Sequence, residues 1–173
     1  MFRMLLLSAL LLIGRMVQAA PVSGEFPSID GGTLSLSDWR GQPVLVVNTA
    51  SQCGFTGQYA GLQKLQDTYG PKGLVVLAVP SDSFNQELDT ASEVKEFCEL
   101  NYDLTLPMTD ITPVTGPQAH PFYKAVAAET GFVPGWNFNK ILLSPDGEVV
   151  ATFGSTTRPD SRKLRRQVEA LLR

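Results

Sequence analysis

The sequence predicts an α/β domain in which helices flank a central mixed β-sheet. Two continuous apolar runs, at 44–47 and 74–79, have the composition of strands that are buried on both faces. A stretch of helical periodicity separates them and completes a β-α-β unit. Two further apolar runs flank Pro145-Asp146-Gly147, which predicts a tight turn and an antiparallel hairpin. Parallel and antiparallel pairs together imply a mixed sheet.

Cys53 lies in the turn between the first of these strands and the following helix. Apolar residues recur at helical spacing from Tyr59 to Tyr69, and Gly70-Pro71 ends the helix. Unpaired backbone amides and the positive end of a helix dipole favour a thiolate at such a position. The polar neighbours Ser51-Gln52 predict a partly exposed sulfur. The alternative is a small core cysteine that serves packing only.

The remaining segments give the order of a thioredoxin-like α/β domain with an added N-terminal hairpin. Asp30-Gly31-Gly32 is a turn signal between two short strands. Thr90-Ala91-Ser92-Glu93 is a capping box that opens a second helix. Two more helices are expected, one containing Phe122 and Val126 and one at the C-terminus with Pro159 in its first turn and an apolar stripe at Leu164, Val168, Leu171 and Leu172.

The N-terminal 19 residues have the pattern of a secretory signal peptide. Arg3 precedes an apolar run from Met4 to Ile13, and small residues near Ala19 offer a cleavage site. The run is short for a transmembrane span, although a retained anchor is the alternative. We therefore expect an exported, periplasmic protein whose residues 20–173 form a single domain without stable membrane insertion.

Charge and residue usage exclude several classes of function. Removal of Arg3 and Arg15 leaves 12 basic residues against 17 acidic ones, a formal charge of about −5, which does not suggest a nucleic-acid partner. His120 is the only histidine, and its place before Pro121 favours a structural role over catalysis or metal binding. No ligands stand at metal-binding spacing, so we expect neither a metal nor a cofactor.

The tetrapeptide that starts at Cys53 favours peroxide chemistry over dithiol exchange. Disulfide reductases need a second cysteine two residues further on, and that position is Thr56. A single activated thiolate can attack a peroxide oxygen and become a sulfenic acid. A thiol-disulfide exchange protein therefore stays a minor alternative.

The segment V-N-T-A-S-Q-C-G-F-T-G-Q-Y at 47–59 resembles the active-site signature of the glutathione peroxidase family in its cysteine form. Similar matches follow in order at 72–80, 101–108, 116–124 and 136–138. The resemblance implies that Trp136 and Asn137 accompany the Cys53 nucleophile. An indole N–H and an amide can stabilise a thiolate and the charge that develops on the peroxide without titrating. The alternative is a packing Trp with an Asn in a turn.

One position departs from the family pattern. The family's P-C-N-Q-F segment reads Pro80-Ser81-Asp82-Ser83-Phe84 here, so Ser83 replaces the glutamine that completes the polar group. Ser83 and the nearby Gln86 are therefore accessory candidates that can restore this contact.

Cys98 is a candidate resolving cysteine or a buried core thiol. Many cysteine-type relatives carry a second cysteine in this region that forms a disulfide with the nucleophile. Cys98 stands one position from where those relatives place theirs, which on a helix turns the side chain by roughly 100°. A disulfide would also require the helix to unwind locally.

The resemblance implies a thiol-dependent peroxidase that reduces hydrogen peroxide and organic hydroperoxides through a Cys53 sulfenic acid, with a role in the response to oxidative stress. The partners are the peroxide and a thiol donor, either a thioredoxin-like protein or glutathione. A non-catalytic thioredoxin-like redox-sensing or binding module of the cell envelope is the alternative.

Overall fold

Strand β3 (Val44–Thr49) is an inner strand of the main sheet. In the computed structural model, which describes residues 21–172, the four-stranded sheet has the order β4-β3-β5-β6. Strand β4 (Val75–Pro80) runs parallel to β3, whereas β5 (Lys140–Leu143) is antiparallel to β3 and β6 (Val149–Phe153) is antiparallel to β5. The predicted signal segment lies outside the described residues.

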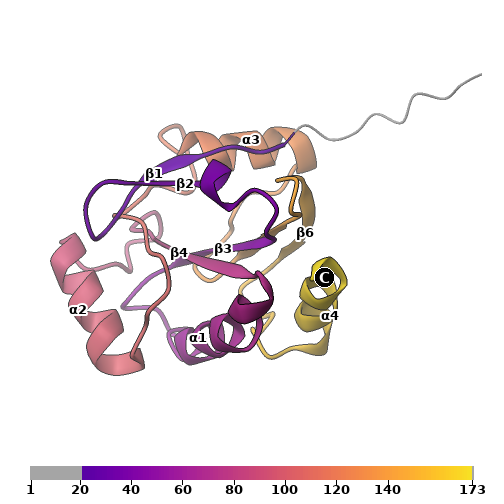
Figure 1. Cartoon of the computed structure of the whole chain (residues 1–173). Helices are drawn as coiled ribbons and strands as arrows, with labels where there is room; N and C mark the ends of the chain where they lie inside the picture. The colour runs from indigo at the N-terminus through magenta and orange to yellow at the C-terminus, as the bar shows by residue number, and fades with distance from the viewer. Residues whose placement is uncertain (1–20, 173) are drawn as a thin grey trace, which may run out of the picture.

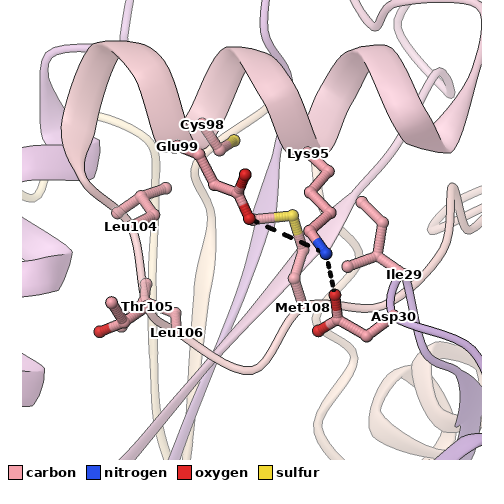
Figure 2. Close-up of a pocket in the computed structure, with 9 residues that line it drawn as sticks. All are labelled: Ile29, Asp30, Lys95, Cys98, Glu99, Leu104, Thr105, Leu106 and Met108. Carbon is pink, nitrogen blue, oxygen red and sulfur yellow. Dashed lines mark hydrogen bonds and ion pairs between the residues drawn. The ribbon is translucent and has the colours of Figure 1, made fainter.

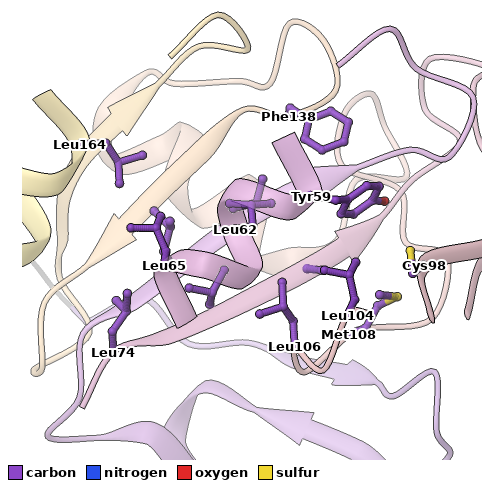
Figure 3. Close-up of a cluster of buried hydrophobic side chains, with 14 of the residues drawn as sticks. Tyr59, Leu62, Leu65, Leu74, Cys98, Leu104, Leu106, Met108, Phe138 and Leu164 are labelled. Carbon is purple, nitrogen blue, oxygen red and sulfur yellow. The ribbon is translucent and has the colours of Figure 1, made fainter. Parts of the chain in front are cut away.

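Helices lie on both faces of the sheet (Figure 1), and an apolar cluster of side chains fills the space on each face. Alternate residues of β3 divide between them: Leu45 and Val47 enter one apolar cluster, while Val44 and Val46 enter the other. The first cluster joins the sheet to α1 (Gln58–Tyr69), α2 (Ala91–Tyr102) and α4 (Arg162–Leu171). Figure 3 shows Leu62 and Leu65 of α1 packed in it.

The second cluster lies under α3 (Pro121–Thr130) and the N-terminal hairpin of β1 (Glu25–Pro27) and β2 (Thr33–Ser35). Two short 3-10 helices, η1 (Leu36–Trp39) and η2 (Gly70–Lys72), follow β2 and α1. The sequence therefore predicted the architecture correctly: a three-layer, thioredoxin-like α/β fold with a mixed sheet, flanking helices and an added hairpin. None of the helices in residues 21–172 is long and apolar enough to cross a membrane.

The local signals in the sequence are confirmed at most helix ends. The capping box at the start of α2 is present in both directions between Thr90 and Glu93. The prediction for Pro159 is wrong, because α4 begins at Arg162 with Ser161 as its N-cap. Pro159 instead packs against α1, where its Cβ lies 3.1 Å from the position that a Cβ on Gly61 would occupy.

His120 has the structural role that the sequence favoured. It is the N-cap of α3, where its Nδ1 accepts a hydrogen bond from the Phe122 amide at 3.2 Å. Its Nε2 bonds the Glu25 carbonyl at 2.9 Å, and its ring stacks on Phe26. The histidine thus joins α3 to the hairpin. Burial lowers its pKa, which keeps the ring neutral in this role.

Candidate active site

Cys53 lies in the turn that follows β3, as predicted, but its side chain is buried rather than partly exposed. Only 4% of the residue is exposed, and it packs in the same apolar cluster as Ala50 and Tyr59. The expectation failed because the turn alternates: Ser51 and Cys53 point inward, while Gln52 and Gly54 are exposed. The Thr56 amide donates to the Cys53 carbonyl at 3.1 Å, which closes the turn before α1 begins at Gln58.

Two successive residues of the loop between β4 and α2 hold the Cys53 turn. The Gln52 amide donates to the Gln86 carbonyl at 2.9 Å. The Ser51 amide donates to Glu87 Oε1, also at 2.9 Å. Each amide immediately before Cys53 therefore has a partner from the same loop.

Gln86 also links this turn to the loop before β5. Asn137 Nδ2 donates to Gln86 Oε1 at 3.3 Å, and Asn137 is fully buried. The structure thus brings together two of the predicted residues, Gln86 and Asn137, beside the turn that carries Cys53. Asn137 Oδ1 is buried and has no hydrogen-bond partner among the described residues.

Trp136 lies at the surface next to this group. It is 40% exposed, and its ring is tilted against Phe84 with the centroids 5.4 Å apart. Phe84 comes from the same loop as Gln86, so the aromatic pair connects the two loops across the site. A large exposed indole of this kind is not explained by core packing.

Ser83 stands at the position of the family's glutamine, but its side chain does not point toward Asn137. Its hydroxyl accepts a hydrogen bond from the Val114 amide at 3.0 Å and lies 3.1 Å from the Ser81 hydroxyl. These contacts direct Ser83 toward the loop that precedes α3. Of the two accessory candidates, Gln86 is the one that accepts a hydrogen bond from Asn137.

Asn48, near the end of β3, positions Trp136 and Asn137 and was missed by sequence reasoning. Its side chain donates to the Trp136 carbonyl at 3.0 Å and accepts from the Asn139 amide at 3.0 Å. Asn139 Nδ2 donates to the same Trp136 carbonyl at 2.6 Å. The signal was an asparagine at the end of an otherwise apolar strand, which needs buried hydrogen-bond partners.

Lys140 contacts the start of α1, which follows the Cys53 turn. Its buried ammonium group donates to Gln58 Oε1 at 2.5 Å and to the Thr157 carbonyl at 2.7 Å. Burial lowers the pKa of Lys140 to about 7. This residue ties the first residue of α1 to the loop between β6 and α4.

Cys98 is buried on α2 and faces the Tyr59 hydroxyl (Figure 3). Burial raises the pKa of its thiol to about 12. A cavity of about 220 Å³ lies beneath α2, with Cys98 and Met108 among its lining residues. Lys95 also lines the cavity and forms ion pairs with Asp30 and Glu99 (Figure 2). Both cysteines are free thiols in this structure.

Comparison with known proteins assigns the chain to a family. Residues 24–127 match the family described as Glutathione peroxidase. The chain is 42% identical over 149 residues to a protein named Glutathione peroxidase from Lactococcus lactis subsp. cremoris, a match that covers 83% of this chain and 94% of the relative. It is also 42% identical over 156 residues to Hydroperoxy fatty acid reductase gpx1 from Synechocystis sp., covering 84% and 91%.

A solved structure agrees with this assignment. The crystal structure of Trgpx in apo form superposes with a TM-score of 0.69 at 30% identity and covers 87% of this chain and 93% of that chain. In general terms, the protein is a thioredoxin-like domain with a cysteine in the turn after a central strand. The chain belongs to the glutathione peroxidase family, and it is a peroxidase among the oxidoreductases.

The buried Glu87 carboxyl predicts a specific pH dependence of stability. Burial raises its pKa above the ordinary value of 4.5, so the folded state favours the protonated form. The corresponding stability is complete below pH 4.5 and is lost as the pH rises through the folded-state pKa. Glu87→Gln should therefore unfold at a higher temperature than wild type at pH 8, and the gap should close toward pH 4.

Thermal unfolding followed by circular dichroism at several pH values measures this gap. Glu129→Gln, an exposed change on α3, is the control and should show no such trend. If the difference in unfolding temperature between Glu87→Gln and wild type did not change with pH, the loss of stability could not be assigned to the Glu87 carboxylate.

Proposed function

We propose that Cys53 reduces hydroperoxides through a sulfenic acid intermediate. The Cys53 thiolate attacks one peroxide oxygen and the O–O bond breaks, so that sulfur is oxidised to sulfenic acid and the leaving oxygen takes a proton to become water or an alcohol. The observation that carries this proposal is the convergence of the Cys53 turn, Gln86 and Asn137, which meet through the Gln52 amide and the Asn137 side chain.

The neighbouring donors suit this reaction. The side-chain amides of Gln86 and Asn137 and the Trp136 indole N–H cannot lose a proton near neutral pH, so they can stabilise negative charge on sulfur and oxygen without neutralising it. Asn137 is fully buried, which strengthens such a contact because water does not compete with it.

The surface beside the site favours organic hydroperoxides as substrates in addition to hydrogen peroxide. Trp136 and Phe84 form an aromatic pair next to Asn137, and Trp136 is 40% exposed. An apolar substrate tail can pack on such rings. A relative that is 42% identical is named a hydroperoxy fatty acid reductase, which supports the same substrate class here.

We propose that an external thiol reduces the Cys53 sulfenic acid while α2 stays folded. Cys98 is 1% exposed and burial raises the pKa of its thiol to about 12, so the thiolate needed for attack is scarce in the folded protein. Either glutathione or a thioredoxin-like protein meets the chemical requirement. The N-terminal apolar segment supports the further proposal that the enzyme acts after export, in the periplasm.

Cys53→Ser should abolish peroxide reduction without loss of the fold, since a hydroxyl is far too weak an acid to supply the nucleophile. Peroxide consumption in the presence of a thiol reductant measures the effect, with Cys98→Ser as the matched control that should retain activity. Turnover in Cys53→Ser would refute the mechanism.

Trp136→Phe, Asn137→Ala and Gln86→Ala should each slow the oxidation of Cys53 by roughly 10- to 1000-fold, because each removes one aligned donor. Stopped-flow measurement of thiol loss after mixing with peroxide gives the rate constants. Ser83→Ala is the control, since the Ser83 hydroxyl bonds Val114 and Ser81 instead. Equal rates in all four variants would remove the donors from the mechanism.

Mass spectrometry after one equivalent of peroxide tests the state of Cys98. We expect a Cys53 sulfenic acid, trapped by a dimedone reagent, and a Cys98 thiol that is still alkylated after unfolding. A loss of two hydrogens together with a Cys53-Cys98 crosslinked peptide would instead establish Cys98 as the resolving cysteine.

A further inference from the structure

Glu87 is a buried acidic residue to which the mechanism above gives no part. Glu87 is 6% exposed, and its Oε1 accepts hydrogen bonds from the Ser51 and Leu88 amides, each at 2.9 Å. Oε2 is buried without a hydrogen-bond partner among the described residues. A buried carboxyl that is half unsatisfied costs stability, so its presence calls for a compensating role.

Within residues 21–172, Glu87 takes part in no ion pair. The titratable groups that face it are Tyr59 from α1, Cys98 from α2 and Asp82 from its own loop. The Ser51 hydroxyl also faces it, and the side-chain oxygens of Ser51 and Tyr59 are themselves buried without a hydrogen-bond partner in the part of the chain that the structure describes. Glu87 is thus joined to a distant part of the chain at Ser51, where its Oε1 accepts a hydrogen bond from the backbone amide.

That bond lies two residues before the nucleophile. The adjacent Gln52 amide is held by the Gln86 carbonyl at 2.9 Å, and the Gln86 side chain accepts from Asn137. Gln86 and Glu87 thus hold the backbone that precedes Cys53. Gln86 also accepts a hydrogen bond from the side-chain amide of Asn137. Loss of the Glu87 contact would release one of the two amides by which this loop holds the backbone before Cys53.

We propose that Glu87 is a positioning residue for the peroxidase reaction, whose Oε1 holds the Ser51 amide and so aligns the Cys53 thiol with Gln86 and Asn137. The inference rests on the proposed reaction of Cys53 with peroxide. It is the acceptor position, and not the negative charge, that performs this role.

Two substitutions separate the acceptor from the charge. Glu87→Asp keeps the carboxylate but withdraws it by about one C–C bond, roughly 1.5 Å, so the contact with the Ser51 amide is lost. Glu87→Gln removes the charge but keeps an oxygen at the acceptor position. Glu129→Asp, on the exposed face of α3, controls for the same change elsewhere. If Glu87→Asp does not fold, Glu87→Met, which fills similar space without a strong acceptor, takes its place.

Two measurements are made on each variant: the rate of Cys53 oxidation by hydrogen peroxide, and hydrogen-deuterium exchange at the Ser51 and Gln52 amides. We expect Glu87→Asp to slow oxidation by roughly 2- to 10-fold, in keeping with the loss of one hydrogen bond that does not depend on charge, and to speed exchange at Ser51. Glu87→Gln should restore both values toward those of wild type.

Wild-type oxidation and exchange in Glu87→Asp would overturn the proposal, as would slow oxidation in Glu87→Gln with protected amides, which would assign the role to the charge. The exchange measurement does not depend on peroxide chemistry. Failure of wild-type Cys53 to react would therefore refute the proposed function while the exchange data still tested the contact.

Discussion

Asn48 is the residue through which the central strand and the candidate site are joined. Its backbone amide donates to the Asn139 carbonyl at 3.2 Å, and its carbonyl accepts from the Phe138 amide at 2.6 Å. Its side chain makes the further bonds to Trp136 and Asn139. Since β3 is buried on both faces and hydrogen-bonded on both edges, these bonds transmit the rigidity of the sheet to the loop that carries Trp136 and Asn137.

The same bonds explain an unusual backbone conformation. Phe138 has a φ of 59°, in the left-handed region that residues other than glycine rarely adopt, and it is fully buried. Such a conformation costs on the order of 1–3 kcal/mol and persists only where the surroundings enforce it. Here two contacts enforce it. The Phe138 amide donates to the Asn48 carbonyl, and the Phe138 ring packs against the Tyr59 ring with the centroids 5.1 Å apart. The strained residue directly follows Asn137, whose side chain donates to Gln86.

Buried polar groups are concentrated at this end of the sheet. Glu87 and Lys140 are both buried there. Desolvation raises the pKa of Glu87 and lowers the pKa of Lys140, so it favours the neutral form of each side chain. Elsewhere the two clusters on the faces of the sheet are apolar. Functional sites commonly violate the packing rules that the rest of a fold obeys, and the protein accepts a loss of stability for an aligned set of donors and acceptors.

The sequence was sufficient to predict the elements of the fold but not the contacts between its loops. Periodicity and capping signals identified β3, α1 and α2 because these features are local. The burial of Cys53 and the orientation of Ser83 depend on how the loop after β4 folds back over the turn, and no local pattern encodes that. For the same reason Glu87 and Asn48 were missed, although each is a polar residue whose partners come from distant segments.

The number of peroxide molecules consumed for each Cys53 tests the central claim most directly. The purified protein is mixed with a large excess of hydrogen peroxide and a dithiol reductant, and peroxide loss is followed to completion. A peroxidase consumes many equivalents per Cys53 at a rate set by enzyme concentration. Consumption that stops at about one equivalent would show that Cys53 is oxidised but not recycled, as in a redox-sensing module, and would contradict the account.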